Sequence, residues 1–138
     1  MRRNVLATYA GLLLAAVVAF ASHEWGATWH SLVGIAVIGV IAWHVVSQRR
    51  WLTSVARRRL AHPERALVVY NAVLATVFAI VNLSGFPVWF WDAGGLVLVV
   101  HQVTGIAFVP LVLGHLVLNR HRLAARLRSR RRARAASA

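Results

Sequence analysis

Four histidines occur as two pairs with identical spacing. His30 and His44 are fourteen residues apart, and so are His101 and His115. Both pairs lie in apolar stretches, where an ionisable side chain is rare and usually has a function. The imidazole nitrogen is the commonest metal ligand in proteins. The repeated spacing therefore predicts metal ligation rather than four unrelated structural histidines.

An internal repeat surrounds the two pairs. Residues 30–52 align without gaps on residues 101–123, at an offset of 71. The sequence VLAT also occurs twice, at 5–8 and at 73–76, each time shortly after an asparagine. Besides the histidines, the matched positions include Gly34 with Gly105 and Arg49 with Arg120. Such self-similarity predicts two copies of one structural unit, here a helical hairpin.

Four apolar segments must position these residues. No charged side chain occurs within the segments near 5–21, 27–47, 66–84 and 95–118. Each is close to the ~20 residues that cross a ~30 Å hydrocarbon core as a helix. A hydrophobic fraction of 59% is also more than a soluble domain normally carries. We expect an all-α fold, a transmembrane four-helix bundle of two repeated hairpins, over 1–123, followed by a basic tail over 124–138.

The arginines predict the orientation of this bundle. All sixteen basic residues are arginines, and they lie at the N-terminus, in 49–65 and in 120–134. The connections after the first and the third apolar segments contain no arginine, and their only acidic residues are Glu24 and Asp92. The positive-inside rule then places both termini in the cytoplasm. We expect a multi-pass protein of the cytoplasmic (inner) membrane of a prokaryote, with a tail that either lies on anionic lipid or is disordered and that does not bind nucleic acid.

The first apolar segment has a second interpretation. Its basic start, its apolar run and the sequence Ala19-Phe20-Ala21 are similar to a signal peptide with a cleavage site. Because this segment takes part in the internal repeat, we expect it to be retained as a helix.

Helix geometry predicts how the histidines meet. Fourteen residues return to nearly the same helix face and advance by ~21 Å. The helices near 27–47 and 95–118 run in the same direction, so His30 should face His101 near the outer surface. His44 should face His115 near the inner one. Two imidazoles meeting across a bundle, at two levels, are what two b-type haems require. A chain without cysteine cannot attach haem through thioethers.

These motifs resemble the di-haem cytochrome b family. The resemblance rests on the doubled H-x13-H pattern, the glycine four residues after each outer histidine and the four-helix core. The family includes the core of quinol-oxidising cytochrome b and the membrane subunits of formate dehydrogenases and hydrogenases. The elements HEW (23–25) and NLSG (82–85) resemble small four-helix membrane proteins filed as a domain of unknown function.

The resemblance implies axial ligands and a role. It places the ligands at His30, His44, His101 and His115. The function that it implies is electron transfer across the membrane. The chain lacks the additional helices and loops that build the quinone sites of the larger relatives, so the resemblance does not imply quinone chemistry.

Glycines and arginines near the ligands complete the predicted site. Gly34 and Gly105 should let a flat macrocycle approach the backbone. Arg49 and Arg120 lie five residues after the inner ligands and either pair with haem propionates or only anchor the helices. Pro110 should kink the fourth helix between its two ligands.

Two features lie outside this pattern. The segment 51–62 is expected to form a short interfacial helix, with Pro63 starting the next one. His23, His62 and His121 do not repeat and are expected to be solvated. His23, beside Glu24, has an alternative role as a proton or metal site at the outer mouth.

Two nitrogen ligands on each iron leave no vacant position, which favours one-electron transfer. The first hypothesis is therefore a transmembrane electron carrier that works with a redox partner protein or a quinone. The second is a small quinone-linked oxidoreductase acting on superoxide or a metal ion at the outer face. The third is a haem-free scaffold or metal transporter. The sequence leaves open whether the chain is an enzyme by itself and whether it forms a homo-oligomer.

Overall fold

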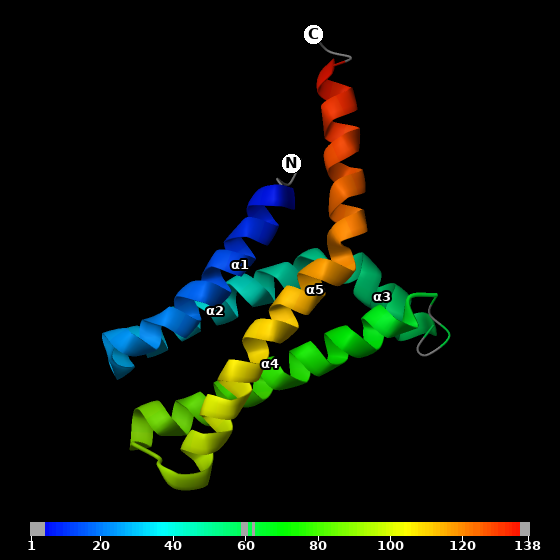
Figure 1. The fold of residues 1–138 in the computed structure, drawn as a ribbon. Coiled ribbons are helices and arrows are strands. Elements are labelled where there is room, and N and C mark those ends of the chain that lie inside the picture. The colour runs from blue at the N-terminus through cyan, green and yellow to red at the C-terminus, as the bar shows by residue number, and fades with distance from the viewer. Residues whose placement is uncertain (1–4, 59–60, 62, 136–138) are drawn as a thin grey trace.

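The described part of the chain is helical throughout. The computed structural model describes residues 5–58, 61 and 63–135, and no strand occurs among them. In chain order the elements are α1 (Val5–Ala21), the short 3-10 helix η1 (Ser22–Trp25), α2 (Ala27–Ser47), α3 (Arg49–Arg58), α4 (Arg65–Trp91) and α5 (Gly95–Ala135). Figure 1 shows their arrangement. The predicted all-α class is confirmed.

Each of the helices α1, α2, α4 and α5 contacts two of the other three. α1 packs on α2 and α4 packs on α5, while α1 also contacts α5 and α2 contacts α4. The two short connections, after α1 and after α4, lie on the same side of the molecule (Figure 1). In this order of neighbours, α2 and α5 lie diagonally across from one another. These are the two helices that carry the four paired histidines.

The packing of α4 on α5 depends on a glycine. The Tyr70 hydroxyl donates to the Leu111 carbonyl at 2.8 Å. A Cβ at residue 114 would collide with this hydroxyl, so the approach requires Gly114. A hydrogen bond between two apolar helices therefore forms where one of them lacks a side chain.

The helices have the length and exposure expected in a lipid bilayer. α2, α4 and residues 95–121 of α5 are long and apolar enough to cross a membrane, whereas the 17-residue α1 is shorter. Among the described residues only Ala16 and Val37 are buried apolar side chains. Large apolar side chains elsewhere are exposed, among them Leu83 at 70% and Leu96 at 78%. Exposure of such an apolar surface to water is unfavourable, whereas the hydrocarbon chains of a bilayer would cover it.

The connection between α2 and α4 contains the expected short helix. α3 covers Arg49–Arg58, so it begins two residues before the predicted 51–62. Residues 59, 60 and 62 of this prediction lie outside the described residues. The Trp51 indole donates to Glu64 Oε2 at 3.1 Å, which ties α3 to the start of α4. α4 begins at Arg65 rather than at Pro63, with Glu64 as its N-cap residue.

α4 extends seven residues beyond its predicted end near 84. The residues after 84, which the prediction leaves to the connection before 95, continue the helix through Pro87 to Trp91. A proline removes one backbone hydrogen bond, here to the Leu83 carbonyl, and the apolar residues around it still favour a helix in lipid. Asp92 then adopts a left-handed conformation with φ 51° and ends α4.

α5 is a single helix of 41 residues. It continues through the predicted boundary between 123 and 124, because the residues that follow are mostly alanine, leucine and arginine, which favour helix. Pro110 lies inside it. The C-terminal part, orange to red in Figure 1, extends away from the other helices.

Candidate functional site

α2 and α5 bring the four histidines together two by two. The ring centres of His30 and His101 are 5.9 Å apart, and the ring planes make an angle of 82°. The ring centres of His44 and His115 are 6.4 Å apart, with an angle of 86°. Each histidine thus meets the partner that the spacing predicted.

The ring separations suit two ligands of one metal ion. A metal–nitrogen bond of about 2 Å and an imidazole radius of about 1 Å place two opposite ligand rings about 6 Å apart. The observed 5.9 and 6.4 Å lie on either side of this value. Both pairs therefore have the separation at which a single iron atom fits between two imidazoles.

Hydrogen bonds define the tautomer of His30. Its Nδ1 lies 3.1 Å from the Ser22 hydroxyl. This hydroxyl already donates its one hydrogen to the Ala19 carbonyl at 2.9 Å, so it must accept from Nδ1. Nδ1 of His30 therefore carries the hydrogen, and Nε2 has the lone pair that a metal needs. Ser22 is fully buried, which protects this arrangement from water.

His101, the partner of His30, has the same tautomer. Its Nδ1 lies 2.9 Å from the Val81 carbonyl, which can only accept. The imidazole lies directly against Gly85 of α4: a Cβ at this position would be 2.9 Å from Cε1 of His101. The outer ring is therefore held between a main-chain carbonyl and a residue without a side chain.

His115 of the inner pair contacts two side-chain amides. Nδ1 of His115 lies 2.8 Å from Oδ1 of Asn71, again an acceptor, so Nε2 of His115 has the lone pair. Asn119 donates to the His115 carbonyl at 2.8 Å and is itself buried. In metal sites a ligating histidine usually donates its other nitrogen to such a partner, which fixes the orientation of the ring.

The two pairs differ in the space beside them. A cavity of about 590 Å³ contains both His44 and His115 and extends between all four long helices and α3. This volume lies within the roughly 300–1,000 Å³ of ligand sites. Its lining is mostly apolar and includes Val37, Phe78 and Phe108.

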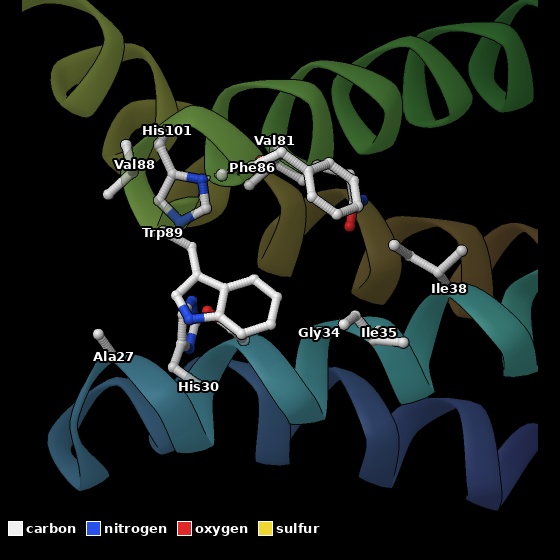
Figure 2. A pocket seen from close by; sticks show the side chains of 13 residues that line it. Ala27, His30, Gly34, Ile35, Ile38, Val81, Phe86, Val88, Trp89 and His101 are labelled. Carbon is white, nitrogen blue, oxygen red and sulfur yellow. Dashed lines mark hydrogen bonds between the residues drawn. The ribbon is translucent and has the colours of Figure 1, made fainter. Parts of the chain in front are cut away.

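The outer pocket is much smaller. It has a volume of about 110 Å³ and is lined by residues of α2, α4 and α5. Figure 2 shows His30 and His101 on opposite sides of it, with their rings directed toward one another. Trp89 and Phe86, both from the extended part of α4, also line it.

The predicted glycines and arginines have different positions. Gly34 lines the outer pocket with open space beside it, whereas Gly105 lies 3.7 Å, measured from its Cβ position, from the Val81 side chain. Arg49 is the first residue of α3, not a continuation of α2, and is exposed. Arg120 is also exposed, and its Nη1 donates to the Val117 carbonyl at 3.2 Å.

His23 and His121 belong to neither pair. His23 is exposed and forms an ion pair with Glu24 at 2.9 Å. His121 is exposed as well. His62 lies outside the described residues.

Each level offers a pair of histidines as possible metal ligands. Within the described ranges, no group of three or more His, Cys, Asp or Glu side chains gathers around one point. A zinc site formed by protein alone needs three or four such ligands. A haem iron is held by its porphyrin and needs only axial ligands from the protein, which a pair of histidines supplies.

No protein-family model, curated protein or solved structure matches the chain. The resemblance to di-haem cytochromes b therefore stays a prediction from the motifs.

Four residues of the site were not identified as such from the sequence. They are Ser22, Asn71, Gly85 and Asn119. Two of them lie in or beside sequence motifs: Gly85 is the last residue of the NLSG element, and Asn71 lies two residues before the second VLAT. An amide or a glycine in an otherwise apolar span is a usable signal, although it does not reveal which histidine it contacts.

Proposed function

We propose that the chain is an integral-membrane di-haem cytochrome of the b type, which carries electrons across the membrane. Its long helices form a transmembrane four-helix bundle of two repeated hairpins. The observation that carries this proposal is the geometry of the two imidazole pairs. They lie at two levels, with ring separations of 5.9 and 6.4 Å.

The tautomers support the same function. His30 and His101 would hold the outer haem, and His44 and His115 the inner one. For His30, His101 and His115, Nδ1 lies within hydrogen-bond distance of a protein acceptor, so Nε2 would be the ligating atom. At His115 the Asn119 amide lies 3.5 Å from Nε2 and would have to move. Three of the four rings are thus prepared for ligation by the protein itself.

The chain's own residues define the chemistry that is available. When bound, each haem supplies a one-electron couple of iron with both axial positions filled. Imidazoles from α2 and α5 therefore keep oxygen and peroxide from binding directly to the metal. The apolar lining excludes water.

Apolar residues also separate the two levels. Val37 is buried between them, and the rings of Phe78 and Phe108 lie 5.5 Å apart in the same region. The levels are ~21 Å apart along the helices, as the rise per residue requires. No charged group of the described chain lies between the two pairs on α2 or α5.

The proposal includes a topology and partners. The arginine distribution favours a cytoplasmic (inner) membrane of a prokaryote, with both termini in the cytoplasm. Electrons would enter and leave through a redox partner protein or a quinone, because nothing in the sequence resembles a nucleotide, flavin or iron–sulfur motif.

A visible spectrum tests the function. The protein, purified in detergent after expression with ample haem supply, should give the reduced-minus-oxidised spectrum of low-spin haem b. A haem assay should find two haems per chain. A colourless protein that is folded and helical would contradict the proposal and leave the haem-free scaffold or transporter.

A further inference from the structure

α4 contributes none of the paired histidines, yet it contacts both paired histidines of α5, His101 and His115. At the outer level the Val81 carbonyl of α4 accepts from His101. At the inner level Asn71 of the same helix accepts from His115. α4 runs antiparallel to α5, so one helix reaches both levels.

The outer contact requires a glycine. In an α-helix a side chain leans back over the carbonyl about four residues earlier. The residue four positions after Val81 is Gly85, so no side chain at residue 85 covers the Val81 carbonyl. This carbonyl also accepts from the Ser84 hydroxyl at 3.2 Å, and the His101 imidazole can still approach it. A Cβ at Gly85 would lie 2.9 Å from Cε1 and 3.1 Å from Nδ1 of His101, closer than such atoms normally come. Figure 2 shows the His101 ring and Val81 at this side of the pocket.

The inner contact is made by a side chain. Asn71 lines the inner cavity together with His115, and its amide oxygen accepts from Nδ1 at 2.8 Å. The two levels thus differ in the chemistry of the acceptor: the inner one can be altered by substitution, whereas the outer one is part of the backbone.

We infer that α4 is a positioning helix, in which Asn71 and the Val81–Gly85 turn orient the two α5 ligands and set their donor strength. This inference rests on the proposed function. A hydrogen bond from Nδ1 raises the basicity of a ligating imidazole. A more basic ligand stabilises the oxidised iron, so each α4 contact lowers the reduction potential of its own haem.

Two substitutions at Asn71 test the inner contact. Asn71→Leu removes the acceptor and should raise the potential of the inner haem, whereas Asn71→Asp replaces it by a stronger acceptor and should lower it. We expect at least a tenfold change in the reduction equilibrium, which is about 59 mV for one electron. Redox titration of the holoprotein, followed at the visible bands of each haem, measures both haems in one sample.

Gly85→Ala tests the outer contact. The added methyl group must displace the His101 ring, so the outer haem should be lost or should shift its potential at least tenfold in the reduction equilibrium. Two variants serve as matched controls: Gly39→Ala adds a methyl group where α2 has open space, and Thr76→Val changes an exposed side chain of α4. Neither control should alter either haem.

The outcomes separate this inference from the proposed function. A change confined to the inner haem at Asn71 and to the outer haem at Gly85 supports the positioning helix. Unchanged potentials with both haems bound would overturn it, and so would equal changes of both haems in each variant. Wild-type protein that binds no haem would instead contradict the proposed function itself.

Discussion

The outer and inner histidine pairs have nearly the same ring geometry but different surroundings. Both pairs of rings are almost perpendicular and about one ligand–metal–ligand distance apart. The inner pair borders a cavity of about 590 Å³, whereas the pocket of the outer pair has about 110 Å³. The ring geometry is therefore nearly the same at both levels, whereas the space beside the rings is much larger at the inner one.

The difference follows from how the chain continues at each level. At the outer level α4 extends to Trp91, and its Phe86 and Trp89 fill the space beside His30 and His101. At the inner level α2 ends at Ser47, and the chain turns into α3. The outer and inner sites therefore differ because the connections between the helices differ at the two levels.

Removal of one ligand should have the largest effect on this comparison. His44→Ala should remove the inner haem alone and reduce the haem content from two per chain to one, because one histidine cannot replace two. His30→Ala should remove the outer haem alone. A haem assay with protein quantification measures both, and His121→Ala, at an exposed position, is the control.

The same variants test whether the pairs belong together. Loss of both haems in each variant, or retention of both, would show that the two levels are not separate sites.

Haem affinity should differ between the levels. The inner cavity already exists, whereas the outer pocket must open, so we expect the inner site to bind at least tenfold more tightly, or about 1.4 kcal/mol. Titration of haem-depleted His30→Ala and His44→Ala proteins compares the two sites one at a time. Equal dissociation constants would mean that the difference in cavity volume has no energetic consequence.

Trp89→Ala should reduce the difference in haem affinity between the outer and inner sites. Loss of the indole enlarges the outer pocket, so haem affinity at that level should rise several-fold, while the inner site should be unchanged. The measurement uses the His44→Ala background, in which only the outer site binds. Trp91→Ala is the matched control, since Trp91 is 76% exposed. A similar gain in both variants would indicate a general loosening of α4.

Arg120→Gln should have the smallest effect. The Arg120 side chain is exposed and bonded to its own helix, which favours anchoring over a propionate contact. We expect the reduction equilibrium of the inner haem to change by less than threefold in a redox titration. A shift of tenfold or more would establish a propionate contact instead.

The sequence predicted the histidine pairs because helix geometry is regular. A spacing of fourteen residues and parallel directions for α2 and α5 suffice to identify partners and levels. Predicting the acceptors of His101 and His115 additionally needs the register of α4 against α5. That register depends on local fits such as Tyr70 against Gly114, and no hydrophobic periodicity encodes them.

The ends of elements were less predictable than their centres. The apolar segment near 66–84 is predicted to end before Pro87, but a proline in an apolar helix loses one hydrogen bond and does not have to end it. The volumes of the two cavities were not predictable either, because they depend on side chains from several helices at once.

The uninterrupted length of α5 has a mechanical consequence. A helix of 41 residues rises by about 60 Å and joins His101 and His115 to the arginine-rich C-terminal part of the chain. This C-terminal part turns away from the direction of the preceding part (Figure 1). Pro110 lies between His101 and His115 and lacks the N–H that would bond to the Ile106 carbonyl, so the helix resists bending least between the two rings. A change of angle at Pro110 would therefore alter the orientation of His115 relative to His101.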